Sequence, residues 1–248
     1  MFKCSGVALT FKTMEKEHYS RFYNIKSLLR KKSKMLLIAG LFIVVVVILC
    51  ATKTSHRGEL EVEMFRILIV GDSLSEFSIK PNGFTSILHE SNNRRADITL
   101  RGFSGYSSEE IREYIDPILR KMDVDLTFLL IGTNDAKVDP SRGHSVEEYT
   151  ANVNQIIRKI HRHSKDVCLI TPPPSNNNEI AGGNDYRNAI ITIAEESKLQ
   201  VIDTWEFIKN EDLYDGIHFN DFGNRKMADE MQQIISNYRL SEFLPDYN

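Results

Sequence analysis

A serine that could act as a nucleophile follows a run of branched apolar residues in the first part of the main body of the chain. The run Ile67–Val70 ends abruptly in Gly71-Asp72-Ser73. A short apolar run that stops at a glycine is typical of a buried strand, so we expect the serine at the edge of a sheet. Two interpretations are open: an ordinary turn from a strand to a helix, or a nucleophile presented at that edge.

His218 is the candidate base for this serine. A serine hydroxyl is a poor nucleophile until a base takes its proton. Asp215 lies three residues before His218 and can reach the imidazole to fix its tautomer, as the third member of a catalytic triad does. The alternative for His218 is a structural histidine before a helix. No comparable polar group surrounds the other histidines: His18, His56, His89, His144, His161 and His163.

Three donors are candidates for an oxyanion hole. Acyl transfer passes through an intermediate with a negatively charged oxygen, which needs preorganised hydrogen-bond donors. The backbone N–H of Ser73 is one, and the backbone at Gly105, which lacks a Cβ atom, lets a second N–H approach closely. The side-chain amide of Asn134 is the third, unless it is a turn or capping residue. Asp72 braces the turn through backbone N–H groups or only caps a helix.

Ser104 is a rival nucleophile that the pattern disfavours. A nucleophile elbow reads Gly-x-Ser-x-Gly, and the stretch from Gly102 to Tyr106 breaks this pattern. The body also contains no Cys/His cluster with the spacing of metal ligands, so we expect no metal and no cofactor.

The candidate residues follow apolar runs that alternate with helical patterns. Because the carboxyl ends of parallel strands meet at one edge, segments after the first, second, third and fifth runs would converge there. This alternation predicts a parallel sheet with helices on both faces. The expected strands are Phe65–Val70, Ala96–Leu100, Leu126–Ile131, Val167–Thr171 and Leu199–Asp203, and the expected helices are Ser107–Met122, Ser145–His163, Asp185–Ser197 and Asp221–Tyr238.

Residues 65–240 resemble the SGNH (GDSL) hydrolase superfamily through Ser73, Gly105, Asn134 and His218. They look most like its isoamyl-acetate-hydrolysing esterase branch, through the stretches "RGFSGYSS", "VEEYTANV", "LITPPP" and "DGIHFNDFGN". The resemblance implies a three-layer α/β/α flavodoxin-like fold and metal-independent ester hydrolysis. In that family the Asp of the Asp-x-x-His segment completes the triad, which carries onto Asp215. Leu100 departs from the branch, which often has Asn there, and a membrane anchor is not typical of it.

An apolar segment precedes this domain. Residues 35–52 contain no charged residue, and the next charge is Lys53. As a helix they would span about 27 Å, just enough for the hydrocarbon core of a membrane. We therefore expect one transmembrane signal-anchor helix before the sheet. Alternatives are a cleaved signal peptide, which would leave a secreted protein, and a buried core segment. The expected organisation is a basic tail 1–34, the anchor 35–52, a stalk 53–64, the hydrolase domain 65–240 and a C-terminal tail 241–248.

The charge distribution predicts the orientation. Residues 1–34 hold nine Lys or Arg and two Glu, whereas the whole chain has a net charge of -3. The basic head therefore belongs on an anionic membrane surface in the cytoplasm, with the acidic body lumenal or extracellular. Nucleic acid is not an expected partner.

The sequence thus predicts a membrane-anchored serine esterase that forms a covalent acyl-enzyme through Ser73, His218 and Asp215. A catalytically idle binding module of the same fold is an alternative, and a nucleotide-binding flavodoxin-like protein is another. The latter needs a glycine-rich phosphate loop after the first strand, where only Gly71 stands. The ester stays open among small-molecule, lipid and glycan substrates. Pro172–Asp185 is expected to be mobile and to line the acyl pocket.

Overall fold

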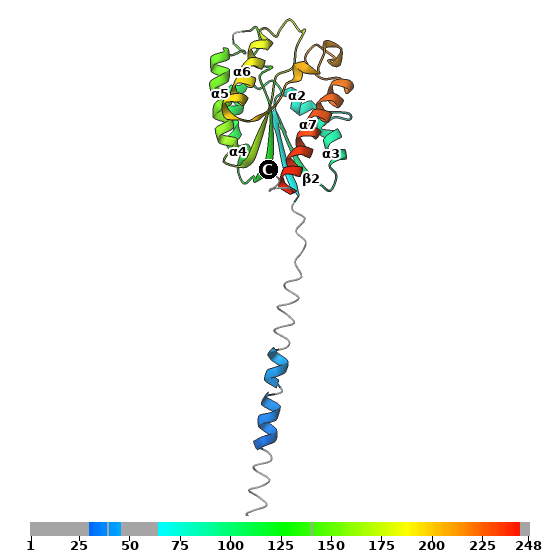
Figure 1. Cartoon of the computed structure of the whole chain (residues 1–248). Coiled ribbons are helices and arrows are strands. Elements are labelled where there is room, and N and C mark those ends of the chain that lie inside the picture. The colour runs from blue at the N-terminus through cyan, green and yellow to red at the C-terminus, as the bar shows by residue number, and fades with distance from the viewer. Residues whose placement is uncertain (1–29, 39, 46–63, 140, 244–248) are drawn as a thin grey trace, which may run out of the picture. The chain divides into compact units, whose positions relative to one another are not determined.

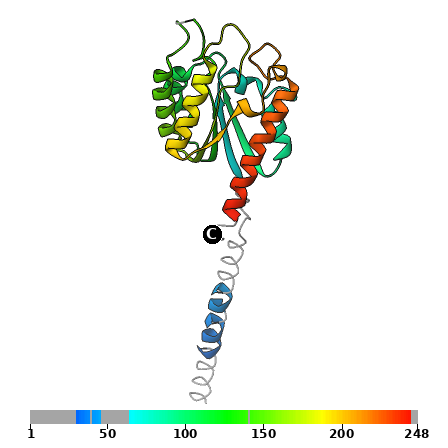
Figure 2. The same ribbon diagram turned by 45° about the horizontal axis from the view of Figure 1, so that its top comes forward.

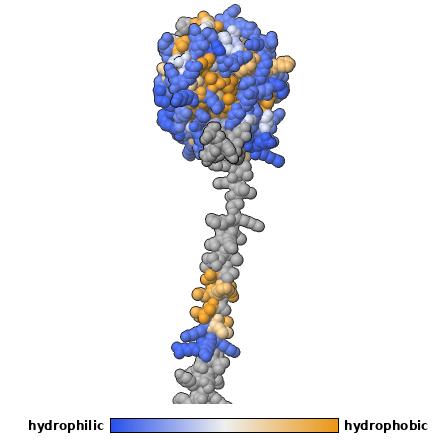
Figure 3. Space-filling model, viewed as in Figure 1, coloured by the Kyte–Doolittle hydropathy of each residue, from blue (hydrophilic) through white to orange (hydrophobic). Residues whose placement is uncertain are grey.

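The computed structural model describes residues 30–38, 40–45, 64–139 and 141–243. The chain divides into two compact units, Met1–Val62 and Glu63–Asn248. In the first unit, residues 30–38 and 40–45 are helical with exposed side chains, basic at 30–34 and apolar from Met35 onward (Figure 3). Among the described residues, no helix is long and apolar enough to cross a membrane. Residues 46–52 of the expected anchor, and most of the expected tails and stalk, lie outside the described residues.

The second unit is built on a parallel sheet of five strands in the order β2-β1-β3-β4-β5. The predicted parallel sheet between two helical layers is therefore confirmed, and this strand order is that of flavodoxin-like folds. The strands are β1 (Phe65–Gly71), β2 (Ala96–Gly102), β3 (Val124–Leu130), β4 (Ser164–Ile170) and β5 (Gln200–Ile202).

Helices cover both faces of this sheet (Figure 1). One layer contains α4 (Ser108–Leu119), α5 (Val146–Ile160) and α6 (Gly183–Ser197), and the other contains α2 (Ser73–Phe77), α3 (Phe84–Ser91) and α7 (Asp221–Phe243).

Each face of the sheet carries its own apolar cluster. Side chains alternate along a strand, so in β1 Ile67 and Ile69 pack toward α3 and α7, whereas Leu68 and Val70 pack toward α4 and α5. Burial on both sides explains why this strand is almost continuously apolar, as is typical of parallel sheets.

The observed elements differ from the expected ones mainly at their ends. α7 continues to Phe243, past the expected domain end at residue 240. α2 and α3 were not predicted, because five and eight residues are too few to show a clear helical period. The 3₁₀ turns η1 (Thr204–Glu206) and η2 (Asn210–Asp212) were also missed.

The end of β1 is packed so tightly that only glycine fits at its last position. A Cβ atom on Gly71 would lie 2.2 Å from the carbonyl oxygen of Leu130 in β3 and 2.3 Å from Ser75 Oγ in α2. The absence of a side chain therefore lets α2 begin immediately after the strand and close to β3. This close approach fixes Ser73, the first residue of α2, at the carboxyl edge of the sheet.

Candidate active site

Ser73, His218 and Asp215 lie in one hydrogen-bonded row at the carboxyl edge of the sheet. His218 Nε2 is 2.9 Å from Ser73 Oγ, and His218 Nδ1 is 2.7 Å from Asp215 Oδ2. An ionised carboxylate only accepts hydrogen bonds, so Nδ1 carries the proton and Nε2 is left to accept the serine hydroxyl. The arrangement can therefore take the proton from Ser73, although 145 residues separate the serine from the histidine.

The turn that carries Asp215 holds its own carboxylate in place. Asp215 Oδ1 accepts the backbone N–H groups of Ile217 at 3.0 Å and His218 at 2.7 Å. Burial by itself would raise the pKa of Asp215, but the hydrogen bonds from His218 and Ile217 outweigh it and keep the pKa below its usual value. The carboxylate is therefore ionised at neutral pH and can stabilise a protonated imidazole.

Two aromatic rings enclose the imidazole of His218. Tyr214 stacks on it with ring centroids 5.6 Å apart, and Phe77 of α2 lies at 5.0 Å on a tilted plane. Only 18% of the histidine side chain is exposed. This enclosure restricts the rotation of the ring and leaves Nε2 directed at Ser73.

Asn134 and Gly105, the two predicted oxyanion donors besides Ser73, lie on the loops that follow β3 and β2. Asn134, which follows β3, is 6% exposed and donates one Nδ2–H to the carbonyl of Tyr106 at 2.9 Å. A primary amide has two N–H groups, so the second stays available for a ligand. Gly105 is exposed with φ at +82°, and no atom lies within 4 Å of where its Cβ would be. Its backbone therefore borders open space.

Asp135, next to Asn134, is a supporting residue that the sequence analysis did not single out. Its buried carboxylate accepts both the backbone N–H and the hydroxyl of Ser108 at the start of α4. The pKa of Asp135 is raised above its usual value, because the effect of burial is larger than the opposing effect of the hydrogen bonds from Ser108. The carboxylate joins the loop after β3 to α4 and so fixes the backbone that carries Asn134.

A second serine–histidine pair lies apart from this row. His144 Nε2 is 2.9 Å from Ser107 Oγ, which also contacts Glu110. Ser107 is 2% exposed and forms a capping box with Glu110 at the start of α4, so its hydroxyl is structural. The spacing Ser-x-x-Glu was the sequence signal for this role. No hydrogen bond in the described part of the chain joins Ser104 Oγ to a histidine, and the N–H of Ser104 donates to Glu76.

Asp72 is fully buried directly behind the nucleophile. It is the N-cap of α2, and its Oδ1 accepts the N–H of Leu74 at 2.9 Å. Its Oδ2 is buried without a hydrogen-bond partner. The pKa of Asp72 is raised to about 7, chiefly because the carboxyl is buried. The N–H of Leu74 opposes this shift, the charge of Asp135 adds to it, and the charge of Lys137 opposes it; the value of about 7 includes all of these effects.

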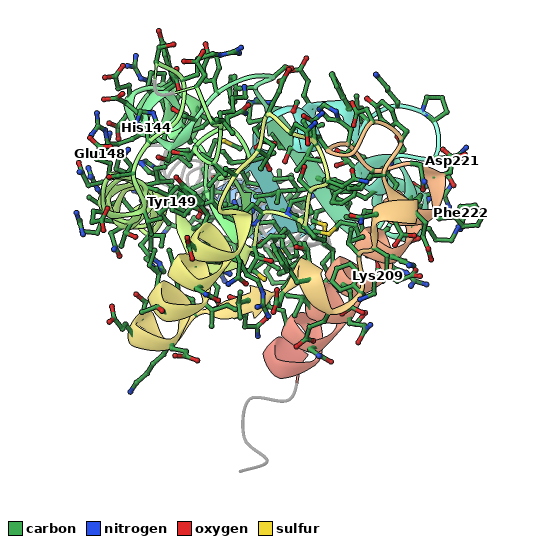
Figure 4. All side chains as sticks on the ribbon, turned by 90° about the horizontal axis from the view of Figure 1, so that it is seen from above. His144, Glu148, Tyr149, Lys209, Asp221 and Phe222 are labelled. Carbon is green, nitrogen blue, oxygen red and sulfur yellow. The ribbon has the colours of Figure 1, made fainter. Side chains whose placement is uncertain are left out.

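A pocket of about 460 Å³ opens beside His218. Apolar and aromatic side chains dominate its lining, and Phe222 at its rim is 74% exposed. Figure 4 shows Phe222 and Asp221 at the start of α7, on the opposite side of the sheet edge from His144. The lining includes Leu74, Phe77, Pro81, Tyr214, Phe219 and Phe222.

No group of three or more His, Cys, Asp or Glu that could hold a metal ion occurs among the residues that the structure describes. Three carboxyl groups of the candidate site have partners within the protein: Asp215 contacts His218, Asp72 caps α2 and Asp135 binds Ser108.

A family model described as "GDSL-like Lipase/Acylhydrolase family" matches residues 69–226. The chain is 28% identical over 193 residues to an isoamyl acetate-hydrolyzing esterase 1 homolog from Mus musculus, covering 64% of this chain and 76% of the mouse protein. It is 25% identical over 198 residues to GDSL esterase/lipase WDL1 from Oryza sativa subsp. japonica, covering 68% and 76% of the two proteins.

Solved structures share the fold. An acetyl xylan esterase, AlAXEase, superposes with a TM-score of 0.63 at 21% identity, covering 68% of this chain and 99% of that chain. A lipase/acylhydrolase from Enterococcus faecalis gives a TM-score of 0.62 at 20% identity, covering 70% and 96%.

Because Asp72 is buried and its pKa is raised, we expect the folded protein to become less stable as the pH rises. Between about pH 4 and about pH 7 the carboxyl ionises in the unfolded chain but keeps its proton in the folded protein, so the free energy of unfolding falls as the pH rises. Above about pH 7 both states are ionised and the loss is complete. Asp72→Asn keeps an oxygen for Leu74 N–H and cannot ionise, so this dependence should vanish.

The measurement is urea unfolding of both proteins across this pH range. The stability of the wild type relative to Asp72→Asn should decrease by up to about 1.4 kcal/mol per pH unit and then become constant. A stability difference that does not change with pH would show that Asp72 is ionised throughout.

Proposed function

The chain belongs to the GDSL-like lipase/acylhydrolase family and is a carboxylic ester hydrolase, and on this basis we propose that Ser73, His218 and Asp215 form its catalytic triad. The predicted resemblance to SGNH hydrolases and their isoamyl-acetate-hydrolysing branch is confirmed. The observation that carries the proposal is the continuous row of hydrogen bonds from Ser73 Oγ through the imidazole to Asp215 Oδ2.

The first half of the reaction forms an acyl-enzyme. His218 Nε2 takes the proton of Ser73 Oγ while the oxygen attacks the carbonyl carbon of the ester. Negative charge develops on the carbonyl oxygen, which the N–H groups of Ser73, Gly105 and the Asn134 amide stabilise. The imidazolium, held by Asp215, then gives its proton to the alcohol oxygen as the carbon–oxygen bond to the alcohol breaks.

The second half releases the acid. With the alcohol gone, His218 takes a proton from water, whose oxygen attacks the acyl carbon. The tetrahedral intermediate collapses, His218 returns the proton to Ser73 Oγ, and the carboxylic acid leaves. No cofactor takes part in this sequence.

We assign the alcohol part of the ester to the pocket beside His218. The leaving oxygen must lie at His218 Nε2 to receive its proton, so the alcohol extends to the histidine side of Ser73. There the polar side chains already have partners within the protein: Asn220 accepts from Phe222 and Gly223, Asn224 binds backbone groups, and Asp221 accepts from Asn82.

The surface left for a ligand is therefore mainly aromatic and aliphatic, with the ammonium of Lys80 packed over Phe77 at 4.0 Å. This chemistry favours esters of apolar alcohols over glycan esters, because the apolar lining stabilises an apolar alcohol by burying it and offers few polar groups to the hydroxyls of a sugar. The name of the mouse relative, an isoamyl acetate-hydrolyzing esterase homolog, is consistent with an apolar alcohol.

We also propose that residues 35–52 anchor the protein in a membrane, with the basic head cytoplasmic and the catalytic domain lumenal or extracellular. Two observations support this proposal: residues 35–38 and 40–45 are helical, apolar and solvent-exposed, and the cations Arg30, Lys31, Lys32 and Lys34 precede them. A catalytically idle binding module is the alternative to the enzymatic proposal, and a secreted form after cleavage is the alternative to the anchor.

The first test concerns the nucleophile. Ser73 should react covalently with a fluorophosphonate, and Ser73→Ala should abolish both labelling and ester hydrolysis, since no other hydroxyl in the described residues forms a hydrogen bond with His218. Asn134→Ala should still fold and should reduce turnover by about 10²–10³, because one oxyanion donor is lost. Ser104→Ala is the matched control and should behave as wild type. Undiminished hydrolysis by Ser73→Ala would refute the triad.

The second test determines whether the pocket binds the alcohol part or the acyl part of the ester. In a series of acetate esters, each additional methylene in the alcohol should raise kcat/KM about fourfold until the pocket is full, because burying one CH₂ contributes about 0.8 kcal/mol. Phe222→Ala should flatten this series without lowering hydrolysis of methyl acetate. An equal gain from lengthening the acyl group, with none from the alcohol, would place the apolar part of the substrate elsewhere.

The third test concerns topology. Protease added to sealed microsomes that contain the full chain should remove only the basic head and leave the catalytic domain intact until detergent is added. Digestion of the domain without detergent would contradict the orientation. A shortened protein recovered in soluble form from the lumen would instead support cleavage and secretion.

A further inference from the structure

The segment between β4 and α6 contacts the turn that carries Asp215. Ser175 Oγ donates to the carbonyl oxygen of Gly216 at 2.7 Å, and Asn177 Nδ2 donates to the carbonyl oxygen of Asp215 at 3.3 Å. These two carbonyls belong to the two peptide groups that directly follow the Cα atom of Asp215. Ser175 and Asn177 therefore hold the turn from outside, whereas the bonds to Ile217 and His218 hold it from within.

The contact is close as well as hydrogen-bonded. Gly216 has φ at +84°, and a Cβ atom there would lie 2.4 Å from Asn176 Oδ1 and 3.2 Å from the backbone nitrogen of Asn177. A residue with a Cβ atom would be strained at this φ and would displace the Asn176 side chain, so glycine favours the close approach of the two loops. The sequence "YDGIH" thus places its glycine where the two loops meet.

The same segment is braced internally and at its other end. Ser175 Oγ accepts the N–H of Asn177 at 3.1 Å, and Asn177 Oδ1 accepts the N–H of Glu179 at 2.9 Å. Further along, Val138 N–H donates to Glu179 at 2.9 Å and Ala181 N–H donates to Ala136 at 2.8 Å. The segment therefore connects the loop after β3, which carries Asn134, with the turn that carries Asp215.

The Asp215 turn needs such support because little of it is buried. The side chain of Asp215 is 40% exposed, and Tyr214 is 60% exposed. An exposed turn without external contacts samples several backbone positions, and small displacements of a catalytic group reduce turnover steeply. The figures agree with the contacts: the loops after β4 and before α7 gather at the same end of the sheet (Figure 2).

We propose that Ser175 and Asn177 are positioning residues that hold the Asp215 turn so that its carboxylate stays on His218 Nδ1. This proposal rests on the triad proposed above, but the positions of Ser175 and Asn177 do not depend on it. Among the described residues, neither one has a hydrogen bond to Ser73 or lines the pocket, so we expect both to act through the turn that carries Asp215.

The experiment compares Ser175→Ala, Asn177→Ala and the double variant with Asn178→Ala, an exposed neighbour without a hydrogen bond to the turn. The double variant should lose about 10- to 100-fold in kcat toward an acetate ester while KM changes less than about twofold. Asn178→Ala should match wild type. Ser175→Thr, which keeps the hydroxyl, should recover most of the activity that Ser175→Ala loses.

Amide hydrogen exchange of Ile217 and His218 tests the positioning role without activity. Both amides donate to Asp215 Oδ1, so their exchange should accelerate at least about fivefold in the double variant and not in Asn178→Ala. Unchanged exchange, or a loss of thermal stability with kcat preserved, would overturn the proposal. If the wild type hydrolyses no ester, the proposed triad fails, whereas the exchange rates still decide whether Ser175 and Asn177 hold the turn.

Discussion

The hydrogen bond between Ser73 Oγ and His218 Nε2 is the interaction on which the candidate site depends, because it joins the first strand of the sheet to the loop before the last helix. A distance of 2.9 Å tolerates little movement at either end. On the serine side, β1 pairs with β2 and β3 along both edges, so its register is fixed twice. On the histidine side, the rings of Tyr214 and Phe77 enclose the imidazole.

Fixing polar groups at this edge reduces the stability of the fold. Asp72 Oδ2, Ser75 Oγ and Thr133 Oγ1 are buried without hydrogen-bond partners, and each such group costs about 1–3 kcal/mol. All three belong to the segments that follow β1 and β3. The apolar clusters on the two faces of the sheet offset this cost. Buried polar atoms without hydrogen bonds are expected beside a nucleophile, because the geometry that a reaction requires can differ from the geometry that is most stable.

The residues that we propose for the reaction fall into two groups of different physical character. Asn134 and the backbone at Gly105 are hydrogen-bond donors, which in the proposed reaction would suit a carbonyl oxygen that gains negative charge. The pocket beside His218 is lined mainly by aromatic and aliphatic side chains, including Phe222 and Tyr214. The segment 175–181 has hydrogen bonds to the loop after β3, which carries Asn134, and to the turn that carries Asp215, so it connects the two loops.

Local apolar periodicity and short motifs were enough to predict the alternation of strands and helices, the convergence of the polar segments at one edge and the family. They also singled out Ser73, Asp215 and His218, which the structure brings into contact. Contacts between residues far apart in the chain became apparent in the folded protein alone. The bond of His144 to Ser107 is one example. Another is Pro172–Asp185, whose composition predicts mobility, yet Ser175 and Asn177 bind the Asp215 turn. Such contacts require two backbones to lie within hydrogen-bonding distance, and no local pattern encodes that distance.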